Sequence, residues 1–408
     1  MFHWTKYSIL IVSGLFLFAC SHPVQHDETD KPLFDKAERA HKELPSINTR
    51  KTSKSVSLQL PENTNQIIYR SEQKKNTARL VNSNLQDIAL KNTVLKSKPE
   101  TVIFQKEEIQ VLDQQTDKSE WGLRVIFDND IWNNTDYYYT NGLAIELITP
   151  LAKNSPINKI LLGTKSTDIE LNGFSIRQNM YTPTNPDVTE ILNNDRPFSA
   201  FLTVGQFRET YNFEKKLHIK SALDIGVLGP ASMGGTIQTG LHTEEPVGWK
   251  NQIQNSFVVN YFIEVEKGIL QTQNFEFNLR GSTNVGSLFN KAGGGFSLRV
   301  GRFIPVFQGP IKSMAKAGKN SPLQFWFFAK GNTDFVLYNA TLQGGLFTTK
   351  SPYTISGNEL NRLIFQASAG IAVYSGSFGI ELENFYLSPE FKGGRSFGWG
   401  RIKLVAMF

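Results

Sequence analysis

The chain has 408 residues, is 40% hydrophobic and 12% aromatic, and carries a formal net charge of +6. This composition supports a large core, yet beyond the first residues no apolar run approaches the roughly 20 residues that a membrane-spanning helix needs. The basic residues are scattered, which argues against a nucleic-acid partner. Ordinary surface composition explains the charge, and attraction to the anionic phosphates of lipids is the functional alternative.

Residues 1–20 have the features of a lipoprotein signal peptide. An apolar run over Ser8–Ala19 follows Lys6 and is too short to cross a membrane. The run ends in Leu17-Phe18-Ala19-Cys20, which resembles a bacterial lipobox, so we expect Cys20 to be lipidated after cleavage. A buried thiol is the alternative. Because Cys20 is the sole cysteine, no intramolecular disulfide can form.

Residues 21–120 are rich in Lys, Gln, Asn, Ser, Thr and Glu and poor in aromatic residues. Their hydrophobic periodicity is weak, and such a segment cannot bury enough apolar surface to offset its chain entropy. We therefore predict a disordered periplasmic tether over this range.

From Trp121 onward the sequence alternates between apolar and polar residues. In the last segment Ile402, Leu404, Ala406 and Phe408 share one face, and Arg401 and Lys403 share the other. Outer-membrane barrels alternate lipid-facing and interior-facing residues in this way, with about ten residues per strand. The fold class expected for residues 121–408 is all-β, a twelve-stranded antiparallel transmembrane β-barrel. The predicted strands are 121–130, 140–149, 169–180, 197–211, 217–228, 251–266, 268–281, 292–304, 322–338, 361–375, 377–387 and 396–408.

A soluble β-sandwich would also hide one apolar face, but the signal sequence, the many aromatic residues and the terminal Phe408 favour the membrane barrel. Charges spaced by two on the interior face predict a lumen held by charge pairs. Lys267-Gly268 and Ser375-Gly376 are predicted as tight turns. With a periplasmic N-terminus, these turns are periplasmic and the loops after odd-numbered strands are extracellular. Those loops are 131–139, 181–196, 229–250, 282–291, 339–360 and 388–395.

Three polar blocks fall at the predicted extracellular rim. The oxygen atoms of the first block, which are carboxylates, amides and carbonyls, suit Ca²⁺. A solvated loop rich in Asn and Asp is the alternative reading. The blocks are Asp128-Asn129-Asp130 with Thr135-Asp136 and Tyr139-Thr140-Asn141-Gly142, then Gln178–Pro183 with Asp195–Phe201, then Asp224–Pro230 with Gln238, His242, Gly248-Trp249 and Gln252.

Of the six histidines, only His242 lies in a predicted outer loop beside the polar blocks. His218 begins a strand near a periplasmic turn, and the other four lie in the signal peptide or tether. A neutral imidazole can act as a general base toward water. Although a lone histidine is more often structural, the three blocks that meet at one rim favour a catalytic role for His242.

Taken in their order along the chain, the blocks resemble the LpxR family of outer-membrane lipid A 3′-O-deacylases. The resemblance is close over residues 125–255, and the rest of the barrel shares only the general pattern. Each motif is weak alone, whereas the ordered set is specific. The motifs are Asn-Asp, Tyr-Thr-x-Gly-Leu, Tyr-Thr-Pro, Asp-Arg-x-Phe-Ser-Ala-Phe-Leu, Asp-Ile-Gly-Val-Leu-Gly-Pro and a spaced Gln, His, Trp and Gln-Ile.

The resemblance implies a Gram-negative outer-membrane hydrolase whose substrate is lipid A or lipopolysaccharide and whose cofactor is Ca²⁺. Its active site would lie between the outer wall of the barrel and a helix of the third extracellular loop. Asn129 and Asp130 fall on the family's Asn-Asp pair, Thr140 on its active-site Thr and His242 on its catalytic His. Asp130 is then the metal ligand, and His242 activates a water that attacks the 3′-acyloxyacyl ester. Membrane lipids and the barrel-assembly machinery are the other expected partners.

The sequence departs from the family at one place. Residues 181–194 contain no Lys or Arg, whereas the family carries a Lys there, so the substrate stays open. Three alternative functions also stay open: a structural or adhesive barrel without activity, a porin-like barrel, and a phospholipase that uses Ser199 or Ser232 with a histidine. The retained site residues argue against the first, and the charged interior argues against the second.

Overall fold

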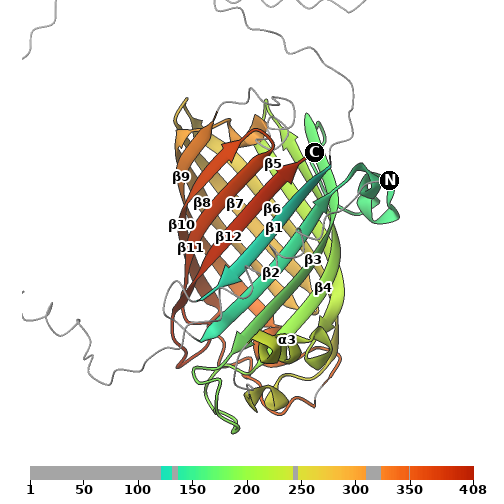
Figure 1. Cartoon of the computed structure of the whole chain (residues 1–408), viewed down its shortest axis with the longest axis vertical. Coiled ribbons are helices and arrows are strands. Elements are labelled where there is room, and N and C mark those ends of the chain that lie inside the picture. Colours follow the sequence, from blue (N-terminus) through green and yellow to red (C-terminus); the bar gives the residue numbers. More distant parts are fainter. Residues whose placement is uncertain (1–120, 131–136, 242–246, 309–322, 349) are drawn as a thin grey trace, which may run out of the picture. The chain divides into compact units, whose positions relative to one another are not determined.

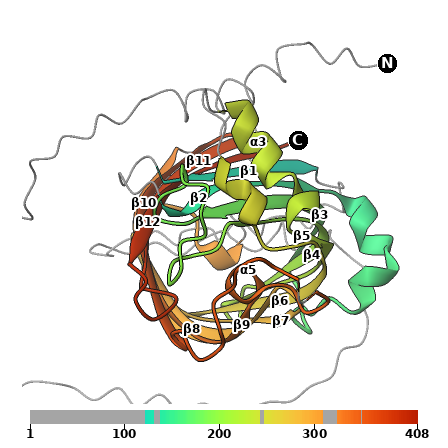
Figure 2. The ribbon, with the colours of Figure 1, turned by 90° about the horizontal axis from the view of Figure 1, so that it is seen from below.

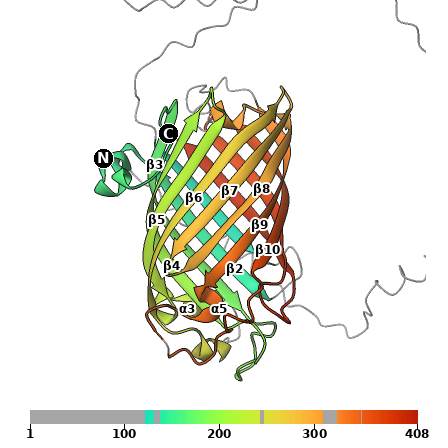
Figure 3. The ribbon, with the colours of Figure 1, turned by 180° about the vertical axis from the view of Figure 1, so that it is seen from behind.

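The computed structural model of the protein describes residues 121–130, 137–241, 247–308, 323–348 and 350–408. The predicted signal peptide and tether, and with them Cys20, lie outside these residues, as does His242. The described part forms a closed barrel of twelve antiparallel strands (Figures 1 and 3), which confirms the expected fold class. The strands are β1 (Gly122–Asn129), β2 (Tyr138–Ile148), β3 (Ile169–Thr182), β4 (Ser199–Asn212), β5 (Leu217–Leu228), β6 (Ser256–Gln271), β7 (Phe275–Gly286), β8 (Phe289–Arg302), β9 (Gln324–Asn339), β10 (Leu363–Ser375), β11 (Phe378–Leu387) and β12 (Phe397–Met407).

Each strand pairs with its neighbours in sequence, and β1 also pairs with β12 to close the barrel (Figure 2). Alternation of side chains along the strands separates the two faces. Arg401 and Lys403 line the lumen, as predicted. Large apolar side chains such as Phe325 and Phe327, which are 40% and 57% exposed, cover the outside. No helix in the described part of the chain is long and apolar enough to cross a membrane.

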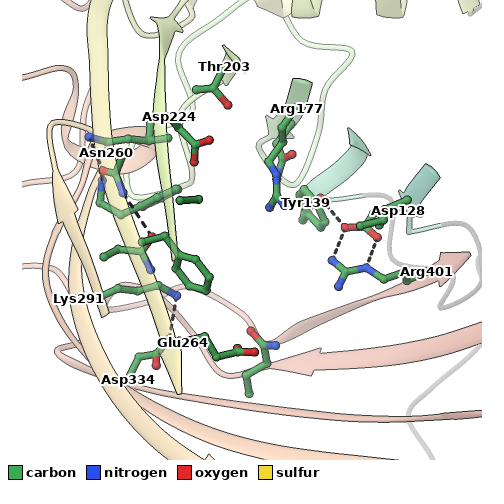
Figure 4. A pocket seen from close by; sticks show the side chains of 18 of the residues that line it. Asp128, Tyr139, Arg177, Thr203, Asp224, Asn260, Glu264, Lys291, Asp334 and Arg401 are labelled. Carbon is green, nitrogen blue, oxygen red and sulfur yellow. Dashed lines mark hydrogen bonds and ion pairs between the residues drawn. The ribbon is translucent and has the colours of Figure 1, made fainter. Parts of the chain in front are cut away.

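Ion pairs fill much of the lumen, as the charge spacing predicted. Arg124 of β1 lies 3.1 Å from Glu146 of β2 and 2.8 Å from Glu209 of β4, and Lys220 of β5 lies 3.0 Å from both carboxylates. Charges withdrawn from water need such partners, because an isolated buried charge is costly. The lumen encloses a cavity of about 550 Å³ (Figure 4), and further ion pairs join neighbouring strands, except for Lys330–Glu383, which joins β9 to β11. They are Arg280–Glu264, Arg299–Glu276, Lys291–Asp334, Lys330–Glu383, Lys403–Glu381 and Arg401–Asp128.

The barrel has two unlike ends. At one end, here called the terminal end, β1 begins beside the end of β12, with Gly122 opposite Met407. The helix α3 (Gly234–Leu241) lies at the other end, here called the α3 end (Figure 1). Most connections at the α3 end are long, whereas β10 and β11 are joined at the terminal end by a tight turn at Gly376, whose φ is 54°. Outer-membrane barrels place short turns in the periplasm and longer loops outside, so we expect the α3 end to be extracellular.

One predicted tight turn is wrong. Strand β6 runs through Lys267 and Gly268 and ends at Gln271, and the chain turns at residues 272–274 instead. The pairing of β6 with β7 shifts register between Gly268 and Leu270. A glycine inside a strand often marks such a bulge, and this one was misread as the second residue of a hairpin turn.

The predicted loop 282–291 is also mostly strand. Strand β7 extends to Gly286 and β8 begins at Phe289, so only two residues connect them. Small and polar residues suggested a loop, but here they make room inside the barrel. A Cβ atom on Gly286 would lie 2.6 Å from the side-chain oxygen of Asn260, which lines the lumen.

An aromatic cluster fills the inside of the barrel at the α3 end. Phe385 and Trp399 stack with ring centroids 4.7 Å apart, and Tyr139 packs edge-on against Trp399 at 5.1 Å. The short helix α5 (Ala340–Gln343) contributes Leu342 to the same cluster. Beside it, the buried guanidinium of Arg196 pairs with Glu390 and donates a 2.7 Å hydrogen bond to Thr341. The mouth of the lumen at this end is therefore occupied by packed side chains.

Candidate active site

The candidate site begins where β1 and β2 end at the α3 end. Asp128 lines the lumen, so alternation turns the next residue, Asn129, toward the outer wall. The Asn129 carboxamide donates a 3.2 Å hydrogen bond to the backbone carbonyl of Thr140. The register of β2 with β3 shifts between Tyr139 and Asn141, which makes Thr140 a bulged residue. Bulges re-aim side chains beside functional sites, and this one sets the direction of the Thr140 hydroxyl.

The hydroxyls of Thr140 and Thr182 lie 2.8 Å apart and share a hydrogen bond. Thr182 ends β3 and is fully buried. The Asn129 amide, the Thr140 carbonyl and the two hydroxyls thus form one polar group across three strand ends. The sequence predicted Asn129 and Thr140 as site residues. Thr182 appeared only as part of a motif, and it is the pairing of β2 with β3 that brings this residue beside Thr140.

Tyr138, just before the bulge, has a φ of 71°, a left-handed conformation that is costly for a bulky residue. Its ring is buried and packs edge-on against Phe397, with centroids 5.4 Å apart, and against Tyr137 at 5.0 Å. The backbone N–H of Arg395 donates to its hydroxyl at 3.2 Å. These contacts hold the strained backbone in place, and with it the bulge at Thr140.

Helix α3 lies over the outward face of β3 and β4, as the family resemblance implied. Met180, Phe198, Ala200 and Trp249 form a buried apolar cluster there, with Ile237 of α3 against it. A Cβ atom on Gly234 would lie 2.4 Å from the Cβ of Ala200, so the helix needs glycine to approach the strand this closely. This apolar cluster and the lack of a side chain at Gly234 together determine how closely α3 packs against the outer wall of the barrel.

Hydrogen bonds fix the segments on either side of α3. The turn η5 (Pro230–Ser232) precedes α3, and the Gln178 amide of β3 donates to the Ser232 carbonyl oxygen. The Trp249 indole N–H, in the turn η6 (Val247–Asn251), donates to the Gln238 side-chain oxygen of α3 at 2.6 Å. Polar residues of the second and third sequence blocks therefore hold α3, the helix that covers the site, in position.

The oxygen donors of the first block fit a hard divalent cation. Asp130 is buried and directly follows Asn129, the last residue of β1, whose amide contacts the Thr140 carbonyl. Carboxylate, amide, carbonyl and hydroxyl oxygens are the ligands that Ca²⁺ prefers. Among the residues that the structure describes, no three His, Cys, Asp or Glu side chains gather as a metal site. A cation here would therefore depend on neutral oxygens as well as on Asp130.

The second outer connection has a basic neighbour that the sequence alone did not place. Asn251 donates a 2.8 Å hydrogen bond to the carbonyl of Thr189, which ties residues 183–198 to η6. The Thr189 hydroxyl bonds Glu190 at 3.0 Å and, with a smaller contribution from the positive charge of Lys250, lowers the pKa of that exposed carboxyl. Lys250 is itself exposed. The rim of the barrel therefore carries the positively charged side chain of Lys250 on η6, whereas residues 181–194 contain no basic residue.

The remaining candidates have different surroundings. His242 follows Leu241, the last residue of α3, but lies outside the described residues. Asp224 of the third block points into the lumen (Figure 4) and is not part of the outward site. Ser199 and Ser232 are both fully buried, and their hydroxyls donate to the carbonyls of Thr341 at 3.0 Å and Gly229 at 2.6 Å. Neither serine has the exposure that a nucleophile needs.

The chain is similar to several solved structures. LpxR from Salmonella typhimurium is 21% identical, with a TM-score of 0.57, and the match covers 70% of this chain and all of that one. The β domain of the Bordetella autotransporter BrkA (10% identity, TM-score 0.36, 71% of this chain and 98% of that one) is also similar. The translocator domain of NalP from Neisseria meningitidis follows (9% identity, TM-score 0.34, 73% of this chain and 91% of that one). A search of the curated proteins found no match.

The sequence also matches a family model. That model, described as outer membrane protein LpxR, covers residues 103–408, which include every strand of the barrel. The match extends well beyond the residues whose motifs first suggested the family. This protein is a β-barrel of the outer membrane and belongs to the LpxR family.

Proposed function

We propose that this protein is a Ca²⁺-dependent lipid A 3′-O-deacylase. The observation that carries the proposal is the polar group formed by Asn129, Thr140 and Thr182. It lies on the outer face of the barrel at the α3 end, beside the helix α3. A site on the outer wall, unlike one in the lumen, is reached sideways from the membrane. At the extracellular end, the lipid that meets it is the lipid A of the outer leaflet.

In the proposed reaction His242 accepts a proton from water, and the resulting nucleophile attacks the carbonyl carbon of the 3′-acyloxyacyl ester. The ester C–O bond then breaks, and the released alkoxide takes up a proton to leave lipid A with a free 3′-hydroxyl and a fatty acid. General-base assistance of this kind typically contributes about 10²–10⁴-fold. Asp130 and Asn129 would hold the Ca²⁺, whose contribution when bound is to stabilise negative charge on the carbonyl oxygen.

In this proposal the Thr140 hydroxyl donates a hydrogen bond to the same oxygen. Because Thr140 and Thr182 share a hydrogen bond, one hydroxyl can orient the other. Loss of a single oxyanion donor typically raises a barrier by about 2.7–4 kcal/mol. The buried apolar cluster under α3 holds this helix against β3 and β4 beside the polar group.

The porin-like alternative is less well supported. Side chains occupy the mouth of the lumen at the α3 end, and ion pairs such as Lys220–Glu146 join strands that are not neighbours. A serine mechanism is also disfavoured by the burial of Ser199 and Ser232. A barrel that has lost its activity would not need the strained backbone at Tyr138.

The test is mass spectrometry of lipid A from a host that expresses the full chain, with Ca²⁺ or with a chelator. Loss of the 3′-acyloxyacyl mass should require both Ca²⁺ and His242. His242→Ala should abolish the change, while the matched variant His41→Ala, in the segment before the barrel, should not. Unchanged lipid A from a wild-type protein that is folded in the outer membrane would refute the proposal.

A further inference from the structure

The connection between β2 and β3 is long for the terminal end and is built rigidly. It contains two 3₁₀ turns, η3 (Pro150–Asn154) and η4 (Pro156–Lys159). The hydroxyls of Thr149 and Ser155 cap them by accepting 3.3 Å hydrogen bonds from the backbone N–H groups two residues later. Figure 2 shows this segment outside the ring of strands, beside β3 and β4.

The segment is fastened to polar side chains that point outward from the barrel. A lipid-facing wall cannot leave such groups without partners, because each would cost several kcal/mol in hydrocarbon. Here the segment supplies the partners along its whole length. Gln206 donates to the carbonyl of Ala152 at 2.8 Å, Tyr261 to that of Ile160 at 2.7 Å, Ser221 to that of Leu162 at 2.8 Å, and Thr164 donates its N–H to Thr210 at 2.9 Å.

An apolar groove of about 400 Å³ runs along the outer wall beside the segment. Ile157 of η4 forms one border, so the same segment that covers the polar patch also bounds the groove. The groove is therefore open to the membrane on one side and bordered by an interfacial segment on another. Its apolar lining comes from β2 to β5 and includes Leu147, Phe174, Ile176, Val204, Leu223 and Ile225.

The segment carries positive charge without compensation. Residues 150–167 include three lysines and no acidic residue. Lys153, Lys159 and Lys165 are all exposed, and no ion pair in the described part of the chain involves them. Leu151 and Ile160 are also exposed, by 65% and 55%. Basic residues interleaved with apolar ones are the pattern of a segment that lies in the headgroup region of an anionic membrane.

We propose that this segment and the groove bind one anionic phospholipid of the periplasmic leaflet. An acyl chain would lie along Ile176 and Val204, and the phosphate would face Lys153 and Lys159. The inference rests on the outer-membrane location of the barrel and on its expected orientation, and it does not depend on the deacylase activity. Lipid A is not the occupant, since it belongs to the leaflet at the opposite end.

Native mass spectrometry of the full-length protein in detergent tests the proposal, with phosphatidylglycerol and phosphatidylethanolamine as separate probes. The wild type should retain one phosphatidylglycerol and much less phosphatidylethanolamine. Each lysine near an anionic lipid surface contributes about 1 kcal/mol, so Lys153→Gln/Lys159→Gln should weaken phosphatidylglycerol binding by about 30-fold. The control Lys216→Gln/Lys267→Gln removes the same charge at the same end and should bind like the wild type.

The groove is tested separately. Val204→Phe fills it and should reduce binding, while Val300→Phe adds the same ring to the outward face of β8, away from the groove, and should not. Both positions are exposed on the outer wall, by 50% and 45%, so neither change is expected to prevent folding.

Three outcomes would overturn the proposal. Equal retention of the two phospholipids would remove the role of charge. Equal weakening by the control pair of lysines would indicate general attraction to the membrane surface. Much stronger phosphatidylglycerol binding by Cys20→Ala than by the wild type would mean that the protein's own lipid anchor occupies the groove.

Discussion

The carboxylate of Asp128 accepts two hydrogen bonds from the guanidinium of Arg401, Nε to Oδ1 at 2.6 Å and Nη2 to Oδ2 at 2.8 Å. The pair joins the first strand to the last and closes the barrel. Asp128 faces the lumen (Figure 4), whereas its neighbour Asn129 faces outward. The closing ion pair therefore stands directly behind the candidate active site, and Asp128 is unavailable as an outward metal ligand.

Arg401→Gln is expected to destabilise the barrel by up to about 3 kcal/mol, because it leaves the buried Asp128 carboxylate without its main partner. The value is at the low end for buried pairs because the Arg401 side chain keeps 28% of its exposure. The measurement is urea unfolding in lipid vesicles, followed by tryptophan fluorescence. Asp128→Asn/Arg401→Gln should recover most of the loss, and a double variant as unstable as the single one would contradict the ion-pair explanation.

Asn129→Ala should weaken the response to Ca²⁺ more than it weakens folding. It removes both an oxygen donor and the hydrogen bond that positions the Thr140 carbonyl. Loss of a group that orients metal ligands typically costs 10–100-fold in affinity, so the Ca²⁺ concentration for half-maximal deacylation should rise by about that factor. Asn154→Ala, at the opposite end of the barrel, is the control. An unchanged Ca²⁺ response in Asn129→Ala would exclude this residue from the metal site.

The sequence predicted the barrel well because alternation is a local signal that each strand carries by itself. The faces of β12 follow directly from Arg401, Ile402, Lys403 and Leu404. Where composition imitates a turn, as at Lys267-Gly268, alternation was overruled and the strand was cut short. The sequence of a single strand does not indicate where its pairing with a neighbour shifts register. The strand ends next to such shifts could therefore not be predicted.

For the same reason, only part of the candidate site could be predicted from the sequence. Asn129 and Thr140 were found through their motifs, but the Thr140–Thr182 hydrogen bond exists because of a bulge in the β2–β3 pairing. Asp128 was grouped with Asn129 and Asp130 as one cluster of oxygen donors. Alternation alone separates Asp128 from Asn129, and applying it at that strand end would have removed Asp128 from the cluster.

Gly234→Val should abolish activity while the barrel remains folded. The added side chain would collide with Ala200, whose Cβ would lie 2.4 Å from the new Cβ, so α3 must lift from the wall. Because α3 takes no part in the pairing of the strands, its displacement should leave that pairing intact. Thr236→Val places the same side chain at an exposed position of α3 and should remain active. Heat-dependent gel mobility would report barrel folding, and lipid A hydrolysis would report the site.

Lys250→Gln should raise KM and leave kcat nearly unchanged. Lys250 is exposed at the rim, near enough to Glu190 to affect the pKa of its carboxyl, and it could meet a phosphate of lipid A where residues 181–194 offer no basic group. An exposed ion pair contributes about 0.2–1 kcal/mol, so the rise in KM should be at most about fivefold and should shrink in high salt. Steady-state hydrolysis of lipid A in mixed micelles at two salt concentrations measures both effects. Lys392→Gln removes another exposed charge and should leave KM unchanged. A fall in kcat for Lys250→Gln, with KM constant, would instead place this residue in the chemical step.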